Sequence, residues 1–419
     1  MNIRSGKNNL SIFTISALLL SVLLSFGYDI YGRQIVKAIY GCKSVKLLNK
    51  KTSHPIEHYY VKSDKIFHQV ILWIAVGIVF INIVIWAAKK RLLTVLLVNI
   101  LTVAVLTELL ITMELAVPGF PRFGLDNFVR NVYESSYRNI IQLEPAFARY
   151  DPVLTYTLKP GTFTFSNREF ANDFYVNSLG VRDDEASLLS PEIIVLGDSY
   201  AMGWGVGQNE TYAELVEKKA GLKTLNTAIA SYGTVREMMM LDRTDTSNLK
   251  FLIVHYHPND YDENMAFYKN NNKLPISDEG AYKDTVKYYK KGKRYYPGKY
   301  IKYAYDSLSR QMSDRLSGSP ATTDRDRAGE RESFINAIIH GSHADLSNVK
   351  LIVIGPAYFT TELKKNIRSG RYHEFINSMQ FIDMPDTEES LCYYKIDAHL
   401  TPKGHAELSD EILNILPKK

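Results

Sequence analysis

The sequence predicts an α/β protein, a three-layer α/β/α domain with a parallel sheet, preceded by an N-terminal transmembrane helical region. Three observations support this fold class. The chain has 419 residues, more than one ordinary domain contains. Long apolar segments are confined to the first 113 residues, and after Pro191 short apolar bursts alternate with helical stretches.

Residues 1–113 form the predicted membrane region. Three segments, 10–28, 67–88 and 92–113, are apolar and close to the roughly 20 residues that a bilayer-spanning helix needs. A cleaved signal peptide would account for the first segment alone. That segment is long, lacks a small-residue cleavage site and is followed by two more spans, which favours three retained helices.

Charge gives two conflicting indications of the orientation of these helices. Lys89, Lys90 and Arg91 lie between the second and third spans, and Arg4 and Lys7 precede the first. Basic residues favour the cytoplasmic side, so this pattern places the C-terminal part outside. The loop 30–65, between the first and second spans, carries eight Lys and Arg residues, and by the same rule these favour placing that loop in the cytoplasm instead.

Residues 114–190 are predicted to be a lead-in segment of mixed short strands. The stretch "YDPVLTYTLKPGTFTF" is typical of extended segments separated by a Lys-Pro-Gly turn. A further short strand and turn are predicted at "FYVNSLGVRDDE".

Residues 191–419 form the predicted catalytic domain. Its strands are expected at 193–197, 224–230, 251–257 and 350–355, with helices at 210–221 and 234–245 between them. Buried strands separated by helices indicate a parallel sheet covered on both faces. Ligands bind at the carboxyl edge of such a sheet, where Ser199 and Asn259 follow two of the strands.

An insertion is predicted at about 265–345. It contains the Lys- and Tyr-rich stretch "VKYYKKGKRYYPGKYIKYAYDSL" and the polar stretch "SGSPATTDRDRAGERES", which is predicted to be a flexible surface segment. Two interpretations of the first stretch stay open. It is either a solvated helical face with Tyr packed beneath it or a surface that binds an anionic glycan or a lipid head group.

Bulk composition excludes two protein classes. The net charge of +5 gives no electrostatic footprint for a nucleic acid, so no nucleic-acid partner is expected. Two cysteines, Cys42 and Cys392, are too few for a disulfide scaffold, and nothing in the sequence requires a bridge between them.

The stretch "IIVLGDSYAMGWGVG" carries the first catalytic candidate. A strand ends at Gly197 and delivers Ser199, while Gly203, Gly205 and Gly207 are interpreted as leaving room for a substrate. A serine nucleophile needs a base and a group that orients that base. His399 and Asp397, in "DAHLTPKGH", provide both, although His399 taken alone is more typical of a capping residue at a helix start.

An oxyanion hole needs donors aimed at the developing charge. The candidates are the backbone N–H groups of Ser199 and Ser231 and the side-chain amide of Asn259, which is alternatively a turn residue. A rival metal site would combine His255 and His257 with two nearby carboxylates, Asp260 and Asp262. No further ligand set accompanies it, so neither a metal nor another cofactor is expected.

These blocks occur in an order that resembles the SGNH branch of the GDSL hydrolase superfamily, from about Tyr150 to Leu416. "GDSY" matches the first block, and "NTAIASYGT" matches the second from Asn226, with Ser231 in place of a glycine. "HPND" matches the third block through Asn259, with His257 in place of a glycine, and "DAHLTPKGH" matches the last. "YDPVLTYTLKPG" and "VNSLGVRDD" are similar to the lead-in of membrane-anchored bacterial members.

The resemblance implies a membrane-anchored serine ester hydrolase, with Ser199 as nucleophile, His399 as base and Asp397 orienting it. It implies removal of small, acetyl-like acyl groups from cell-envelope carbohydrate. The expected partners are an acylated carbohydrate and the lipid bilayer. The expected location is the bacterial inner (cytoplasmic) membrane, with the catalytic domain on the extracytoplasmic side.

Two other functions stay open. The same acyl-enzyme would serve an O-acyltransferase that moves an acyl group onto a cell-surface glycan, with a separate multi-spanning membrane acyltransferase as partner. A non-catalytic glycan-binding protein is the third hypothesis, supported only by the replacements at 231 and 257.

Overall fold

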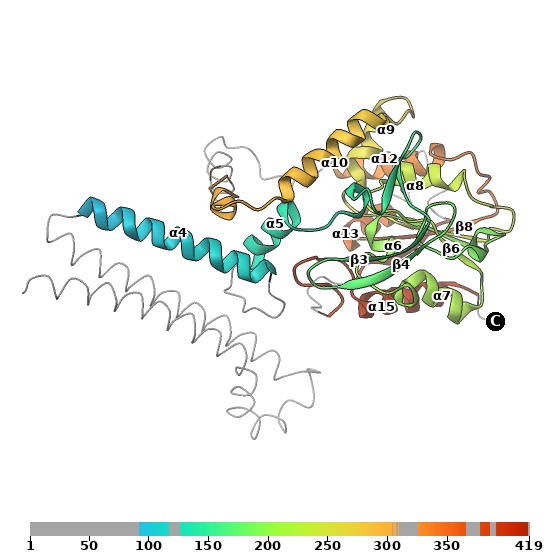
Figure 1. Cartoon of the computed structure of the whole chain (residues 1–419). Helices are drawn as coiled ribbons and strands as arrows, with labels where there is room; N and C mark the ends of the chain where they lie inside the picture. Colours follow the sequence, from blue (N-terminus) through green and yellow to red (C-terminus); the bar gives the residue numbers. More distant parts are fainter. Residues whose placement is uncertain are drawn as a thin grey trace, which may run out of the picture. The chain divides into compact units, whose positions relative to one another are not determined.

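The computed structural model describes residues 92–116, 126–303, 305–306, 309, 326–365, 378–385 and 391–417 (Figure 1). The spans predicted at 10–28 and 67–88 lie outside the described residues. The chain divides into two compact units, the first comprising Met1–Ser135 and Tyr295–Gln311, and the second Ser136–Arg294 and Met312–Lys419. The domain limits predicted at 113 and 190 stay predictions.

In the first unit, a continuous helix, α4 (Leu92–Ala116), occupies the place of the third predicted span. It is followed by α5 (Asp126–Ser136). The buried carboxylate of Glu108 on α4 accepts the backbone N–H groups of Tyr300 and Ile301, both at 3.1 Å. No helix among the described residues has the combined length and apolar character needed to cross a membrane. A helix is present where the sequence predicts one over 92–113.

The second unit begins with two antiparallel hairpins. Strand β1 (Ala148–Asp151) pairs with β2 (Thr155–Leu158), and β3 (Gly161–Ser166) pairs with β4 (Ala171–Val176). The Lys-Pro-Gly turn joins β2 to β3, as the sequence predicts. A short 3-10 turn, Ile141–Leu143, precedes the hairpins, and another, Ala186–Leu188, follows them.

The main sheet has five parallel strands in the order β6-β5-β7-β8-β9. Their bounds are β5 Ile193–Gly197, β6 Thr224–Asn226, β7 Phe251–His255, β8 Lys350–Gly355 and β9 Gln380–Asp383. The strand predicted at 224–230 is shorter than expected because the Asn226 side chain accepts the N–H of Ala228 and turns the chain there. Strand β9 was not predicted.

Helices cover both faces of this sheet (Figure 1), which confirms the three-layer prediction. Ile193 and Val195 of β5 pack with residues of α7 (Tyr212–Ala220) and α15 (Pro402–Ile415). Ile194 and Leu196 instead pack with residues of α8 (Thr234–Leu241), α12 (Arg327–His340) and α13 (Ala357–Lys365). Successive strand residues point to opposite faces, so the apolar run of β5 fills two cores.

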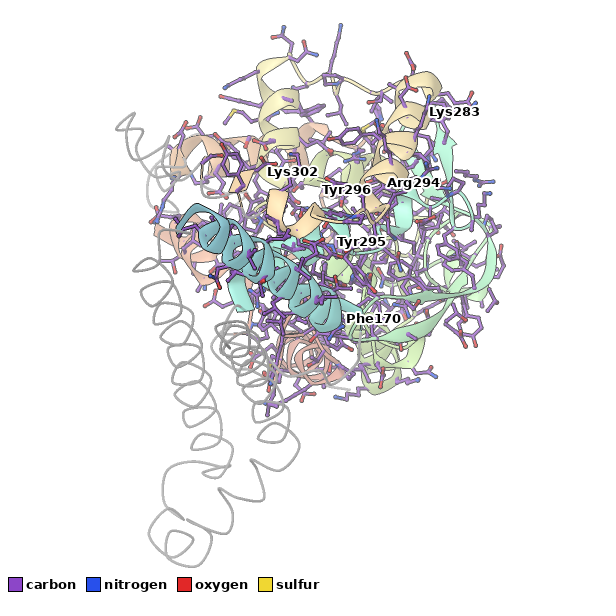
Figure 2. The ribbon with its side chains drawn as sticks, turned by 60° about the vertical axis from the view of Figure 1, so that its left-hand side comes forward. Phe170, Lys283, Arg294, Tyr295, Tyr296 and Lys302 are labelled. Atoms are coloured by element: carbon purple, nitrogen blue, oxygen red, sulfur yellow. The ribbon has the colours of Figure 1, made fainter. Side chains whose placement is uncertain are left out.

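Helix α9 (Asp260–Lys269) leads into the predicted insertion, and α10 (Glu279–Lys293) and α12 lie within it. On α10, Tyr282 is buried and donates from its hydroxyl to the carbonyl of Gln142 at 2.8 Å. Lys283 lies on the outer side of this helix (Figure 2), and Tyr288 is 80% exposed. Helix α10 therefore has a solvated basic face with Tyr282 packed beneath it. Within the stretch 286–308, Tyr289 is half-buried and its hydroxyl accepts the N–H of Ile140 at 2.8 Å, so this part of the stretch agrees with the first of the two interpretations.

Candidate active site

The turn after β5 places Ser199 at the carboxyl edge of the sheet. A Cβ atom at Gly197 would lie 2.5 Å from the Cβ of Ala201 and 3.0 Å from that of His255, so the tight turn requires glycine. Asp198 accepts the N–H of Tyr200 at 2.9 Å and caps a one-turn helix, α6 (Ser199–Met202). Ser199 is the first residue of this turn, and it is buried.

The structure brings Ser199, His399 and Asp397 together in one hydrogen-bonded chain. The hydroxyl oxygen of Ser199 lies 2.8 Å from Nε2 of His399, and Nδ1 of His399 lies 2.5 Å from Oδ1 of Asp397. Thr401, rather than His399, caps α15 by accepting the N–H of Gly404. A hydroxyl, an imidazole and a carboxylate in this order form the arrangement that activates serine nucleophiles.

Two aromatic rings hold the imidazole of His399. Trp204 stacks on it with ring centroids 5.1 Å apart, and Tyr200 packs against it at 4.8 Å. The Tyr200 hydroxyl donates to the carbonyl of Ala398 at 2.9 Å. Burial raises the pKa of Tyr200, so the phenol stays a neutral donor that ties the nucleophile turn to the histidine loop.

Glu169, in the turn between β3 and β4, fixes the backbone of the same loop. Its carboxylate accepts three successive N–H groups, from Lys395 at 3.1 Å and from Ile396 and Asp397 at 2.8 Å. The neighbouring ring of Phe170 (Figure 2) packs on Tyr394 at 5.6 Å. Sequence analysis missed Glu169 because no motif marks a hairpin residue whose partners lie more than two hundred positions further along the chain.

Arg182 fixes the segment that follows the nucleophile. Its fully buried guanidinium donates to the backbone carbonyls of Met202, Gly203 and Val206. Burial lowers the pKa of Arg182 to about 9. The sequence "VNSLGVRDD" places Arg182 in the lead-in and gives it no role, so its contact with the nucleophile segment is a finding of the structure.

The glycines after the nucleophile do not all leave substrate space, which corrects the sequence interpretation. A Cβ at Gly205 would collide with the ring of Tyr394, and one at Gly203 would meet Thr211 and Arg182. These two glycines allow close packing between the nucleophile segment and its supports. Gly207 lies beside the carboxylate of Glu210, which accepts its N–H at 2.8 Å.

Asn226, the first residue of the second sequence block, forms hydrogen bonds to two other segments of the chain. Its Nδ2 donates to the carbonyl of Ala201 in α6 at 3.0 Å, and its backbone N–H donates to Asp183 at 2.7 Å. Burial raises the pKa of Asp183 to about 7. Asn226 therefore joins the nucleophile turn to the loop that carries Ser231.

The two remaining oxyanion candidates follow β6 and β7. Asn259 is the N-cap residue of α9, and its Nδ2 donates to Oδ2 of Asp198 at 3.1 Å. The position therefore fits a turn residue as well as a donor beside the nucleophile turn. Ser231 has a left-handed backbone, with φ of 60°. Its hydroxyl accepts from Gln142 at 2.9 Å, and its carbonyl accepts from Arg236 at 2.8 Å.

The histidines of the rival metal hypothesis have different hydrogen-bond partners. His255 is fully buried, with Nδ1 3.3 Å from the Tyr212 hydroxyl and Nε2 2.9 Å from the sulfur of Met384. Burial lowers its pKa to about 4. Nδ1 of His257 lies beside Oδ1 of Asn259, and its ring stacks on Tyr200 with centroids 4.6 Å apart. Within the part of the chain that the structure describes, no group of three or more His, Cys, Asp or Glu side chains is placed to hold a metal ion.

A scan against protein-family models and a search of curated protein sequences found no match for this chain. Several solved structures are similar. One is a protein of the G-D-S-L family, described as lipolytic, from Desulfitobacterium hafniense, with 10% identity and a TM-score of 0.30, covering 54% of this chain and 98% of that one. Another, described as an acylhydrolase, is from Bacteroides fragilis, with 11% identity and a TM-score of 0.30 over 55% and 90% of the two chains. A family two carbohydrate esterase from Clostridium thermocellum, in complex with cellohexaose, has 12% identity and a TM-score of 0.28 over 54% and 65%.

Proposed function

We propose that this chain is a serine ester hydrolase of the SGNH type that acts through a covalent acyl-enzyme. One observation carries the proposal, the chain of contacts from Ser199 through His399 to Asp397, at 2.8 Å and 2.5 Å. A serine hydroxyl that an imidazole can deprotonate, with a carboxylate holding that imidazole, is the machinery of acyl transfer.

In the proposed reaction, the Ser199 hydroxyl oxygen attacks the ester carbonyl carbon while its proton moves to Nε2 of His399. The tetrahedral intermediate collapses, and the alcohol leaves with the proton from His399. A water molecule then attacks the acyl-enzyme and gives its proton to His399, and the second tetrahedral intermediate releases the acid as this proton returns to the Ser199 oxygen. The proposed donors to the oxyanion are the N–H groups of Ser199 and Ser231 and the amide of Asn259.

The proposed substrate is a small acyl ester on envelope carbohydrate, supported by the motif resemblance. We also propose that residues 10–28 and 67–88 anchor the protein in a bacterial inner membrane with the hydrolase outside the cytoplasm. Their apolar composition and length support the anchoring. Transfer of the acyl group to a sugar hydroxyl would use the same acyl-enzyme and differ only in the acceptor.

The test compares the purified full chain with its Ser199→Ala variant, using a chromogenic acetyl ester and a serine-reactive fluorophosphonate. Turnover and label at Ser199, both lost in the variant, are the expected result. Ser166→Ala, which removes an exposed hydroxyl at the end of β3, is the matched control and should keep both. A folded wild-type protein with an unlabelled Ser199 would overturn the proposal and favour the glycan-binding hypothesis.

A further inference from the structure

The segment before the first hairpin contributes two side chains next to the proposed catalytic residues. The guanidinium carbon of Arg138 lies over the ring of Trp204, 5.9 Å from its centroid. The same Trp204 ring also stacks on the imidazole of His399. Four residues further along, the side chain of Gln142 donates to the hydroxyl of Ser231. The segment therefore contacts the ring that stacks on His399 and an oxyanion candidate, Ser231.

Several polar atoms of these side chains are buried without a hydrogen-bond partner. They are Nε of Arg138, Nε1 of Trp204 and Oε1 of Gln142. Trp204 is only 4% exposed, so its indole N–H has no ready access to solvent. Buried donors in proteins are almost always hydrogen-bonded, and exceptions call for a specific explanation. A bound substrate that supplies acceptors at this place would satisfy both unpartnered donors.

Arg138 differs in its charge environment from two other arginines of the second unit, Arg236 and Arg243. Arg236 is paired with Glu263, and Arg243 forms two 2.8 Å contacts with Asp151. Among the described residues, no ion pair joins the guanidinium of Arg138 to an acidic side chain, and this guanidinium lies over the Trp204 ring. An arginine without an acidic partner, over a ring that stacks on the proposed base, is suited to an anionic ligand, since its planar donors match a carboxylate in two parallel hydrogen bonds.

We infer that Arg138, together with the indole N–H of Trp204, binds a carboxylate of the substrate next to the ester that Ser199 attacks. The inference rests on the proposed function and narrows it to esters that carry a negative charge close to the reacting carbonyl. The carboxylate has two chemical sources. It belongs either to the acyl group, as in a dicarboxylic half-ester, or to an acidic sugar that carries the acyl group.

The test measures kcat/KM of the full chain on two matched pairs of esters. Mono-p-nitrophenyl succinate against p-nitrophenyl butyrate places the charge on the acyl group. An O-acetylated methyl glucuronide against the matching methyl glucoside places it on the alcohol. Arg138→Gln loses the charge-assisted hydrogen bonds. In the pair whose charge lies where the substrate carries its carboxylate, the ratio of kcat/KM for the anionic ester to kcat/KM for the neutral ester should therefore fall about tenfold. Arg149→Gln removes an exposed arginine of β1 and should keep the ratio.

The inference would be overturned if Arg138→Gln lowered kcat/KM equally on the anionic and the neutral ester of each pair. It would also be overturned if the variant kept the wild-type ratio of anionic to neutral ester in both pairs. Fluorophosphonate labelling of Ser199 separates this outcome from failure of the proposed function, because labelling does not depend on substrate charge. If Ser199 is unreactive, calorimetric titration with methyl glucuronide and methyl succinate still tests the site. Binding of one of them that Arg138→Gln weakens about tenfold supports the inference, and no binding of either contradicts it.

Discussion

The carboxylate of Glu169 accepts the backbone N–H of Asp397 at 2.8 Å. The contact joins the β3–β4 hairpin to the loop that carries the proposed base. Because the same carboxylate accepts the two preceding N–H groups, it fixes the backbone orientation just before Asp397 and His399. Glu169 is therefore a positioning residue, which acts on the reaction through the loop and not by touching the substrate.

Replacing Glu169 with Gln should lower kcat about tenfold and leave KM nearly unchanged, because one charged acceptor for three N–H groups becomes a neutral one. Steady-state kinetics on an acetyl ester, with the pH profile of kcat, is the measurement. A displaced loop would change the pH profile, whereas simple loss of stability would not. Glu185→Gln is the control, since Glu185 is an exposed carboxylate that accepts a backbone N–H in another turn. Equal effects of both variants would contradict a specific role for Glu169.

Asn259 offers a test of the proposed oxyanion hole. Its amide donates to Asp198, directly before the nucleophile, so Asn259→Ala removes a donor from the nucleophile turn. Loss of one oxyanion donor costs about a hundredfold or more in kcat. We expect a decrease of that order, measured as turnover of the acetyl ester by folded protein. Asn248→Ala, at an exposed position whose amide meets the carbonyl of Ser190, should retain activity. An unchanged kcat in Asn259→Ala would reduce Asn259 to a turn residue.

At Ser231, the contribution of the backbone N–H to the proposed oxyanion hole can be separated from that of the side-chain hydroxyl. Its φ of 60° lies in the region that favours glycine, and the related sequence block has glycine at this position. If the backbone N–H is the donor, Ser231→Gly should keep kcat within about threefold despite losing the bond from Gln142, since the strained conformation is relieved. A hundredfold loss would instead show that the hydroxyl contributes to the reaction. Circular dichroism and thermal unfolding serve as the check on folding.

The parts of the site that the sequence predicts are those that lie close together in the chain or at strand ends. Ser199 follows an apolar burst, and Asp397 and His399 are two residues apart, so local patterns reveal them. Glu169 and Arg182 act on backbone atoms of distant segments, and such contacts leave no spacing that a sequence can display. Strand β9 is a four-residue edge strand, too short to be predicted by its periodicity.

His405, which follows Gly404 in the last sequence block, provides a pH-dependent prediction about stability. It is buried, its Nδ1 accepts the N–H of Tyr212 at 3.2 Å, and burial lowers its pKa from 6.5 to about 3. Between these values, the unfolded chain binds a proton that the native protein does not bind. Stability from this residue is thus fully present above pH 6.5 and is lost as the pH falls toward 3.

The linkage relation predicts a measurable difference between the wild type and His405→Gln, which keeps an acceptor but does not titrate. From pH 7 to pH 5, the free energy of unfolding of the wild type should decrease by about 2 kcal/mol more than that of the variant. Urea denaturation at the two pH values is the measurement. The difference between the proteins cancels the opposing contribution of buried acids such as Asp183, whose raised pKa favours the folded state at lower pH. If the two stabilities decrease in parallel, His405 is not held neutral by burial in the native protein.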